Sequence, residues 1–166
     1  MAAGGDVVVH LRLADASDRE NLVGLWERSV RATHTFLTES DIETLRPATR
    51  DELGRTDITW WLAVSEADEV IAFLGFKLDC IEALFVDPAH RGRGAGRLLV
   101  AVAQRFAAGD LFVEVNEQNL AAVGFYEANG FATVQRLPTD GAGRPFPLLR
   151  MLRKAQLSLS RSMGAA

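Results

Sequence analysis

Seven short stretches of the chain have the apolar or alternating pattern of β-strands, and turn residues separate most of them. Two of these stretches, 60–65 and 69–77, are joined by the short turn 66–68 and are expected to form a hairpin. Pro88 ends the next stretch, because proline cannot donate a hydrogen bond to a strand ladder. The expected strands cover residues 7–13, 60–65, 69–77, 81–86, 111–116, 131–137 and 146–152.

Two helices are expected in the first third of the chain. The first follows Ser17 or Asp18, either of which could cap it. A second and more polar helix is expected within 39–55, with Pro47 close to its start or at a break. The first helix has one face formed by Leu22, Leu25, Trp26 and Ser29.

Two further helices are expected in the second half of the chain. The one over 119–129 has clear ends: Asn119 suits an N-cap, Gly130 suits the left-handed position past the C-terminus, and Phe131 supplies the apolar contact that often follows. The one over 96–107 is predicted from apolar residues at helical spacing, namely Leu98, Leu99, Val102, Ala103 and Phe106.

This order of elements predicts an α+β domain with a largely antiparallel sheet of about seven strands and about four helices. We expect one domain over 7–153, a disordered N-terminus over 1–6 and a mobile tail over 154–166.

Composition narrows the class of protein. The 166 residues are 48% hydrophobic and 24% charged, an ordinary globular mixture, and the net charge of −4 argues against nucleic-acid binding. The single cysteine, Cys80, allows no internal disulfide, and the three histidines lie far apart, so no metal site is expected. No apolar run approaches a membrane span and no signal peptide is evident, so we expect a cytoplasmic protein.

The most informative stretch is RGRGAG, residues 91–96, directly before the apolar positions of the third helix. Bare glycine N–H groups can converge on phosphate oxygens, and the first turn of a helix adds unpaired donors and a positive dipole end. Arg91, Arg93 and Arg97 add charge suited to phosphate. The alternative is a glycine-rich turn with solvated arginines.

Two other phosphate loops do not fit this stretch. A P-loop needs Lys-Ser/Thr after the second glycine of its motif, where this chain has Arg97 and Leu98. The dinucleotide fingerprint G-x-G-x-x-G fails from Gly92 and from Gly94, and residues 87–91 separate the strand from the glycines.

The segment LFVDPAHRGRGAGRLL resembles the central motif of the GNAT superfamily of N-acetyltransferases, [Q/R]-x-x-G-x-[G/A], and VNEQNLAAVGFYEANGF (115–131) resembles a second motif of that family. The resemblance extends over residues 7–153 and includes the order of strands and helices. It implies a GNAT-type fold with a splay between the central strands. ATHTFL, NEQN and GRPFPLL further resemble small bacterial members assigned as amine or protein-lysine acetyltransferases.

The resemblance implies that acetyl-coenzyme A is the cosubstrate and that no metal is used. Pantetheine would bond to exposed backbone in the splay like an added strand. The implied cofactor-binding residues are Leu84, Phe85, Val86, Arg91, Gly92, Arg93, Gly94, Ala95, Gly96, Arg97, Asn119 and Tyr126.

Tyr126 resembles the family tyrosine that protonates the departing thiolate of coenzyme A. Asn119, Ala122, Val123 and Tyr126 stand at i, i+3, i+4 and i+7 and so share one helix stripe, with the small Ala122 leaving room for a ligand. Without the resemblance, a tyrosine here would be taken for packing. Phe125 is expected to face elsewhere, into the core.

The attacking amine must lose a proton, because an alkyl amine with a pKa of about 10.4 is almost wholly charged at neutral pH. Glu82 is the first candidate base, since alternation along its strand puts it on the face of Leu84 and Val86. A partly solvated strand glutamate is the alternative. Acyl transfer through Cys80 is a minor possibility beside direct attack in a ternary complex.

Three residues are candidates for contact with the acceptor amine. The resemblance places substrate-binding residues after the first helix, where His34 stands. Asn116, at the end of a central strand, could line the same opening, and Phe36 could form part of the acceptor-pocket wall, with a place in the core as its alternative. A structural role is the alternative for the histidine. Trp60 and Trp61 could also form part of the pocket wall.

The resulting hypothesis is an N-acetyltransferase that acts on a primary amine, either a protein lysine or N-terminus or a small amine, as a monomer or homodimer. The negative charge mildly favours basic acceptors and disfavours nucleic-acid-linked ones. The alternative is a non-catalytic acyl-coenzyme A-binding sensor or partner-binding module.

Overall fold

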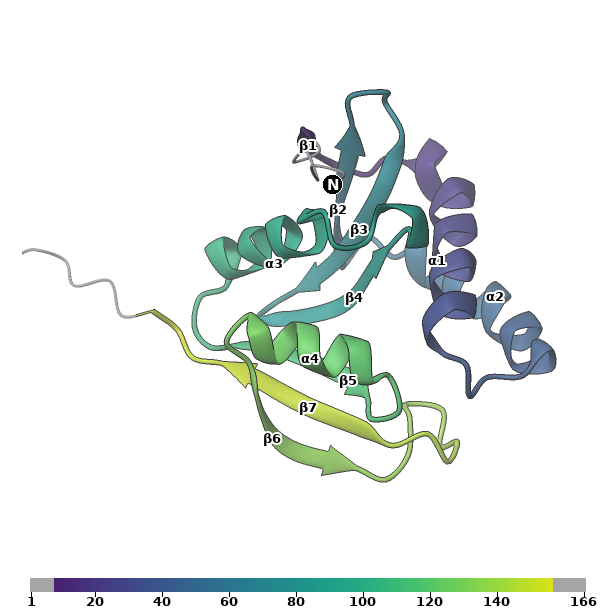
Figure 1. The fold of residues 1–166 in the computed structure, drawn as a ribbon, viewed down its shortest axis with the longest axis vertical. Helices are drawn as coiled ribbons and strands as arrows, with labels where there is room; N and C mark the ends of the chain where they lie inside the picture. The colour runs from purple at the N-terminus through teal and green to yellow at the C-terminus, as the bar shows by residue number, and fades with distance from the viewer. Residues whose placement is uncertain (1–7, 157–166) are drawn as a thin grey trace, which may run out of the picture.

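A seven-stranded mixed sheet forms the centre of the molecule in the computed structural model, which describes residues 8–156. The strand order is β1-β2-β3-β4-β5-β7-β6 (Figure 1). Five neighbouring pairs are antiparallel and the central pair, β4 with β5, is parallel. The strands are β1 (Val9–Leu13), β2 (Thr59–Ser65), β3 (Val70–Lys77), β4 (Cys80–Val86), β5 (Leu111–Asn116), β6 (Ala132–Leu137) and β7 (Leu148–Arg153).

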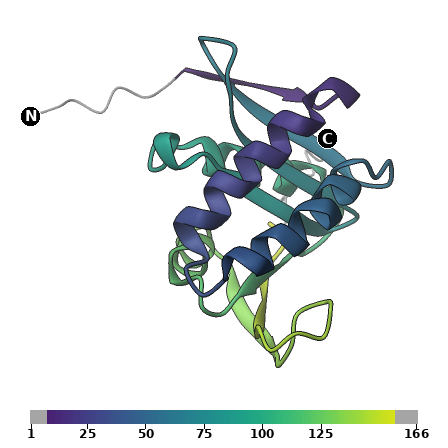
Figure 2. The ribbon, with the colours of Figure 1, turned by 90° about the vertical axis from the view of Figure 1, so that its right-hand side faces the viewer.

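Helices cover both faces of this sheet. The helices α1 (Arg19–Thr33) and α2 (Glu39–Leu53) lie side by side on one face, toward the viewer in Figure 2. The helices α3 (Ala95–Phe106) and α4 (Leu120–Ala128) lie on the other face. The predicted α+β architecture, with a mostly antiparallel sheet and four helices, is therefore confirmed for the described residues.

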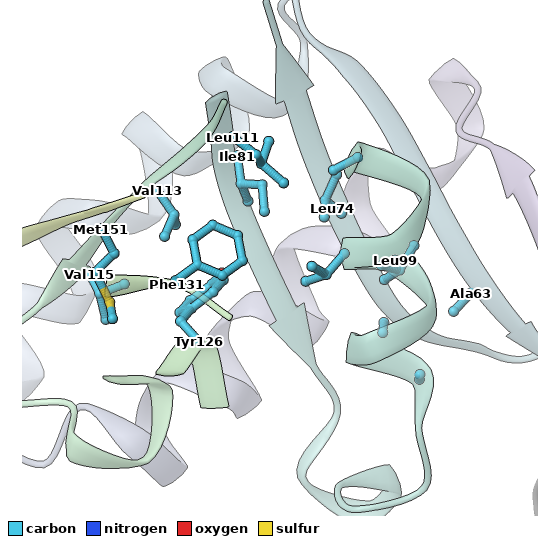
Figure 3. Packing of buried hydrophobic residues seen from close by; sticks show 14 of the residues in the cluster. Ala63, Leu74, Ile81, Leu99, Leu111, Val113, Val115, Tyr126, Phe131 and Met151 are labelled. Carbon is cyan, nitrogen blue, oxygen red and sulfur yellow. The ribbon is translucent and has the colours of Figure 1, made fainter. Parts of the chain in front are cut away.

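Each face of the sheet has its own hydrophobic core. Phe73 and Leu74 are neighbours on β3 and both are fully buried, yet they enter different cores, because successive strand side chains point to opposite faces. Phe73 packs under α1 with Leu25 and Trp26. Figure 3 shows the core on the opposite face, in which Tyr126 and Phe131 pack together against the centre of the sheet.

The prediction that Pro47 lies near the start or at a break of the second helix is wrong. The helix begins at Glu39 and runs through Pro47 to Leu53. A capping box sets this start: the Thr38 hydroxyl accepts a hydrogen bond from the Asp41 N–H at 3.2 Å, and the Asp41 carboxylate accepts one from the Thr38 N–H at 2.8 Å.

The helix starts and buried faces also differ in detail from those predicted. Asp18 stands at the N-cap of α1, but its carboxylate is held by Arg12 at 2.8 Å and does not cap the helix. On α3, Leu98 and Phe106 are exposed. Phe106 lies at the last turn of α3, where it stacks on Trp61 outside the core, and the buried face consists of Ala95, Gly96, Leu99, Val100 and Ala103.

The two central strands separate soon after they begin. Their ladder contains only Cys80 with Phe112 and Ile81 with Val113, although β4 continues to Val86 and β5 to Asn116. Figure 1 shows β4 diverging from β5 over the rest of its length. This is the predicted splay, and it leaves one backbone edge of β4 without a strand partner beyond Ile81.

A bulge in β4 coincides with the start of the splay. Gly75 of β3 pairs with Ala83 and Phe76 pairs with Ile81, so Glu82 is an extra residue in β4. Beside the bulge, the Trp60 ring covers Gly75 so closely that a Cβ there would lie 2.5 Å from it. Of the two places open to Trp60, the acceptor-pocket wall and the core, the structure shows the core.

The expected disordered N-terminus, 1–6, lies outside the described residues. The expected tail over 154–166 is described only as far as residue 156. In that part, the Lys154 ammonium and the Ala155 N–H both donate to the Asp110 carboxylate, at 2.9 and 2.8 Å. The chain is therefore held against the domain for at least two residues past β7.

Candidate active site

A cleft of about 540 Å³ opens where β4 leaves β5. Its wall contains all the residues that the sequence resemblance assigned to the cofactor, which are Leu84–Val86, Arg91–Arg97, Asn119 and Tyr126. Side chains from the last turns of α1 complete it from the opposite face of the sheet. The splay thus brings three separate segments of the chain to one site.

The β4 part of the wall offers backbone groups. On one edge, Leu84, Phe85 and Val86 pair with β3. Their side chains are used for packing, since Leu84 and Val86 join the core under α3 and α4 while Phe85 joins the core under α1. Only the backbone on the unpaired edge is left for a ligand, which can add to it as a further strand would.

The glycine loop needs two of its glycines for their backbone conformation. Gly92 and Gly94 have φ values of 71° and 89°, a region that other residues adopt at a cost. A Cβ built on either residue meets nothing within 4 Å, so open space lies above both. Gly96 is required for close packing and not for its backbone conformation, because a Cβ there would lie 3.3 Å from the Phe125 ring.

The loop ends at an uncapped helix N-terminus. The first intrahelical hydrogen bond of α3 runs from the Leu98 N–H to the Gly94 carbonyl at 3.0 Å, and no side chain caps the helix. The N–H groups of the first turn are therefore free to bind an anion. Within residues 8–156, Arg91, Arg93 and Arg97 form no ion pair, whereas most other arginines do. The cleft thus has unneutralised positive charge at this end.

Tyr126 brings a phenol to the same cleft from α4. Tyr126 is only 5% exposed, and its ring packs edge-on between Phe125 and Phe131, each with ring centroids 5.2 Å away. Figure 3 shows the contact with Phe131. Burial raises the pKa of this phenol above its ordinary value. No hydrogen bond among the described residues uses the hydroxyl, so it remains a protonated donor available to a ligand.

Asn119 has the predicted N-cap role, and its Nδ2 group remains available to a ligand. Its Oδ1 accepts a hydrogen bond from the Ala122 N–H at 3.2 Å, and the side chain is buried at the cleft wall. The described residues leave Nδ2 without an acceptor, so Asn119 can donate hydrogen bonds to a ligand from this group. At the other end of α4, Gly130 has a φ of 87° and Phe131 is buried, as predicted.

The bulge changes where Glu82 points. Ile81 and Leu84 both join the core under α3 and α4, although they are three residues apart, so simple alternation fails between them. The Glu82 charge contributes, after burial, to the raised pKa of Glu52 at the end of α2. The prediction that Glu82 shares the face of Leu84 and Val86 is therefore wrong. Glu82 is exposed and is not part of the cleft wall, and its charge acts on Glu52 and Arg55 near the end of α2 as well as on Cys80.

The predicted acceptor residues occupy different positions. His34 lies in the cleft wall. Phe36 is outside that wall but contacts His34 on one side and Phe146 of the β6–β7 loop on the other, with centroid separations of 5.4 and 5.6 Å. Asn116 is not in the wall, and its Oδ1 accepts a hydrogen bond from the Gln118 N–H at 2.9 Å in the turn before α4.

Several cleft residues were not found from the sequence. Phe125 was expected to face elsewhere, but it lies in the cleft wall and reaches Gly96 of α3. Ser29, Thr33 and His90 also line the cleft. Helical spacing had already put Ser29 on the inner face of its helix, which is the signal that could have drawn attention to it.

Cys80 is not prepared to act as a nucleophile. Burial, followed by the charges of Glu82 and Glu114, raises the pKa of its thiol to about 11. A nucleophilic cysteine needs a lowered pKa, because the thiolate is the reactive form. The environment of Cys80 therefore favours direct attack of an amine on the thioester.

An extended ligand with a diphosphate at one end matches this cleft. A free strand edge leads to a glycine loop, to three arginines without an ion pair in the described part of the chain, and to a helix N-terminus. A buried phenol beside the strand edge suits a departing thiolate. These features define the class of acyl-coenzyme A-dependent transferases. The chain belongs to the GNAT family of acetyltransferases, whose family model, "Acetyltransferase (GNAT) family", matches residues 22–131.

Two curated relatives extend the likeness over almost their whole length. The chain is 38% identical to the peptidyl-lysine N-acetyltransferase YjaB of Salmonella typhimurium, over 88% of this chain and 99% of the relative. It is 39% identical to YjaB of Escherichia coli K12, over 87% and 97%. The solution structure of apo YjaB from Escherichia coli superposes with a TM-score of 0.80, again over 87% of this chain and 97% of that one.

A more distant structure shares the fold. The PaiA N-acetyltransferase of Thermoplasma acidophilum, solved in complex with coenzyme A, is 20% identical with a TM-score of 0.73 over 89% of this chain and 99% of that one.

The family match and the two close relatives show that the present chain is an N-acetyltransferase enzyme with acetyl-coenzyme A as its acetyl donor. Among residues 8–156, no group of histidine, cysteine and carboxylate side chains could hold a metal ion, and no helix is long and apolar enough to cross a membrane.

Replacement of Gly94 by valine should abolish binding of coenzyme A, because the side chain would occupy the open space above the loop. Gly143 supplies a matched control: it also has a positive φ and open space around its Cβ position, but it lies outside the cleft. Both variants should lose roughly 1–3 kcal/mol of stability through backbone strain. Calorimetric titration should show loss of affinity in Gly94→Val alone, and normal affinity in a folded Gly94→Val protein would contradict the proposed phosphate site.

Proposed function

We propose that the enzyme transfers the acetyl group directly from acetyl-coenzyme A to the side-chain amine of lysine in proteins or peptides. The observation that carries the transfer chemistry is the convergence of a free strand edge, a phosphate-type loop and the Tyr126 phenol in one cleft. The lysine acceptor is supported by the peptidyl-lysine activity named for two relatives that align over nearly their whole length. The net charge of −4 also favours approach of basic acceptors.

In this proposal the chain binds the cofactor chiefly through backbone groups. The diphosphate lies against the Arg91–Arg97 loop and the first turn of α3, and the pantetheine arm adds to the free edge of Leu84–Val86. Donors of Asn119 complete this contact. The thioester is then held in the splay with one face open to the acceptor, which supplies proximity and orientation for direct attack.

The two proton transfers fall to groups on opposite sides of the splay. Glu82 takes a proton from the incoming ammonium, directly or through water, from the α2 side. Tyr126 donates to the sulfur as negative charge develops on it. Because burial raises the pKa of the phenol, Tyr126 is a weaker acid than the thiol and must donate its proton in concert with cleavage of the C–S bond, after which the tyrosinate regains a proton from solvent.

The acceptor class can be identified by coenzyme A release. Purified protein and acetyl-coenzyme A are mixed in turn with lysine peptides, N-terminal peptides with blocked lysines, free amino acids, polyamines and aminoglycosides, and free thiol is measured. We expect release with the lysine peptides, and mass spectrometry should place the acetyl group on the lysine Nζ. Release with a small amine alone would overturn the lysine assignment but leave the transferase chemistry intact.

Replacement of Tyr126 by phenylalanine should lower turnover by about tenfold or more while affinity for acetyl-coenzyme A and melting temperature stay close to wild type. The hydroxyl has no hydrogen-bond partner among the described residues, and the edge-on contacts with Phe125 and Phe131 remain in the variant. Steady-state rates and a thermal melt measure the two effects. Unchanged turnover would exclude a proton-donor role for this hydroxyl.

Replacement of Glu82 by glutamine should lower kcat/KM near neutral pH, and the deficit should shrink as the pH rises toward the pKa of the amine. At high pH more acceptor is uncharged and needs no base. Glu114→Gln is a matched control, since Glu114 is an exposed strand carboxylate paired with Arg150 at 2.7 Å. A deficit that is equal at every pH would show that Glu82 is not the base.

A further inference from the structure

The last two turns of α1 bring a small polar group to the cleft. Ser29, Thr33 and His34 all line it, from the helix that covers the opposite face of the sheet. The Thr33 hydroxyl oxygen lies 2.7 Å from the Ser29 carbonyl oxygen and 2.8 Å from Nδ1 of His34. These two distances determine where the protons are.

A threonine hydroxyl has one proton to donate. A carbonyl oxygen has none, so at 2.7 Å the proton between Thr33 and Ser29 must come from Thr33. The contact between Thr33 and Nδ1 therefore needs its proton from the ring. Nδ1 of His34 carries the hydrogen and donates it to Thr33.

The histidine ring is neutral in this environment. Burial, followed by the nearby charge of Arg91, lowers the pKa of His34 from 6.5 to about 4. A neutral ring with a proton on Nδ1 has a bare lone pair on Nε2. Nδ1 is directed back to its own helix, so Nε2, on the opposite side of the ring, is the nitrogen left for the cleft. The Phe36 ring packs against the imidazole, with ring centroids 5.4 Å apart and the planes tilted by 55°.

The ligand group that suits Nε2 is an uncharged donor attached to an anion. The positive charge of Arg91 disfavours an ammonium beside His34 and favours phosphate. Coenzyme A has such a group directly next to its diphosphate, because the pantothenate arm begins with a hydroxyl and an amide N–H. We propose that Nε2 of His34 accepts a hydrogen bond from this pantothenate arm.

Ser29 brings a second polar group to the same part of the cleft. Its side chain is 3% exposed and lines the same cleft, but no hydrogen bond among the described residues uses its hydroxyl. This hydroxyl is accessible from the cleft, since the buried polar side-chain atoms that lack a partner among the described residues are Trp60 Nε1 and His90 Nδ1. A polar ligand that passes the last turns of α1 can therefore form a hydrogen bond with it. Ser29 and His34 are thus two polar groups with which the pantothenate arm can form hydrogen bonds between the phosphate loop and the splay.

The inference rests on the cofactor site proposed above, and two ligands separate the two ideas. Coenzyme A carries both the diphosphate and the arm, whereas adenosine 3′-phosphate 5′-diphosphate has the diphosphate without the arm. The variant His34→Phe keeps a planar ring but removes the acceptor. We expect its affinity for coenzyme A to fall about fivefold, the effect of one neutral hydrogen bond, and its affinity for the nucleotide to equal that of wild type.

Two further variants exclude a merely structural effect. His34→Gln places an amide oxygen near the position of Nε2 and should restore most of the coenzyme A affinity. His10→Phe removes an exposed histidine of β1 outside the cleft and should change neither affinity. Equal loss of both ligands in His34→Phe would overturn the proposal, as would an unchanged coenzyme A affinity. Failure of wild type to bind the nucleotide would instead overturn the phosphate site.

The tautomer can be observed without any ligand. Long-range ¹H–¹⁵N spectra of the histidine rings distinguish the two neutral forms, and His34→Phe assigns the signal among three histidines. We expect a protonated Nδ1 and a bare Nε2 at neutral pH in wild type. Thr33→Val removes the oxygen that receives the proton, so the preference should weaken in this variant. A protonated Nε2 in wild type would overturn the proposal.

Discussion

The short ladder between β4 and β5 is the constraint on which the rest of the structure depends. Backbone N–H and C=O groups inside a sheet are normally paired, because an unpaired buried group costs free energy. Here pairing stops after Ile81 and Val113, so each strand presents an unpaired edge to the other. The bulge at Glu82 begins at the same point and leaves one extra residue in β4. The cleft, the free strand edge and the exposed carboxylate all follow from this local departure from regular pairing.

The two halves of the sheet stay together because other contacts replace the missing ladder. On one face, Phe125 of α4 packs against Gly96 of α3, which joins a helix next to β5 with a helix that packs on β3 and β4. On the other side, Phe36 after α1 meets Phe146 before β7. Glycine at 96 is needed for the first of these contacts, since a Cβ would press on the ring. A residue within the phosphate loop therefore also determines how the two halves pack.

The positions of the strands along the chain, the four helices and the glycine loop before α3 were predictable from the sequence because each depends on local signals. Positive φ at Gly92 and Gly94 and the cap of Asn119 are local properties of the chain. The direction of Glu82 was not predictable, because a bulge is set by pairing with a partner strand and breaks the period of two. Pro47 inside α2, the exposed Leu98 and the inward Phe125 likewise depend on tertiary contacts. The proton on His34 depends on two distances between side-chain and backbone atoms, which no spacing rule contains.

If the cofactor binds along the unpaired edge of β4 as proposed, it is a structural component as well as a substrate. A ligand that adds to this edge behaves as an eighth, non-peptide strand between the two halves of the sheet. Because it can bind only where the halves are correctly placed, it stabilises the folded chain by mass action, and the free energy of unfolding rises with the logarithm of its concentration. Coenzyme A and acetyl-coenzyme A share this arm, so the product supports the fold as the substrate does. The enzyme would then be least stable in the interval between release of one cofactor molecule and capture of the next.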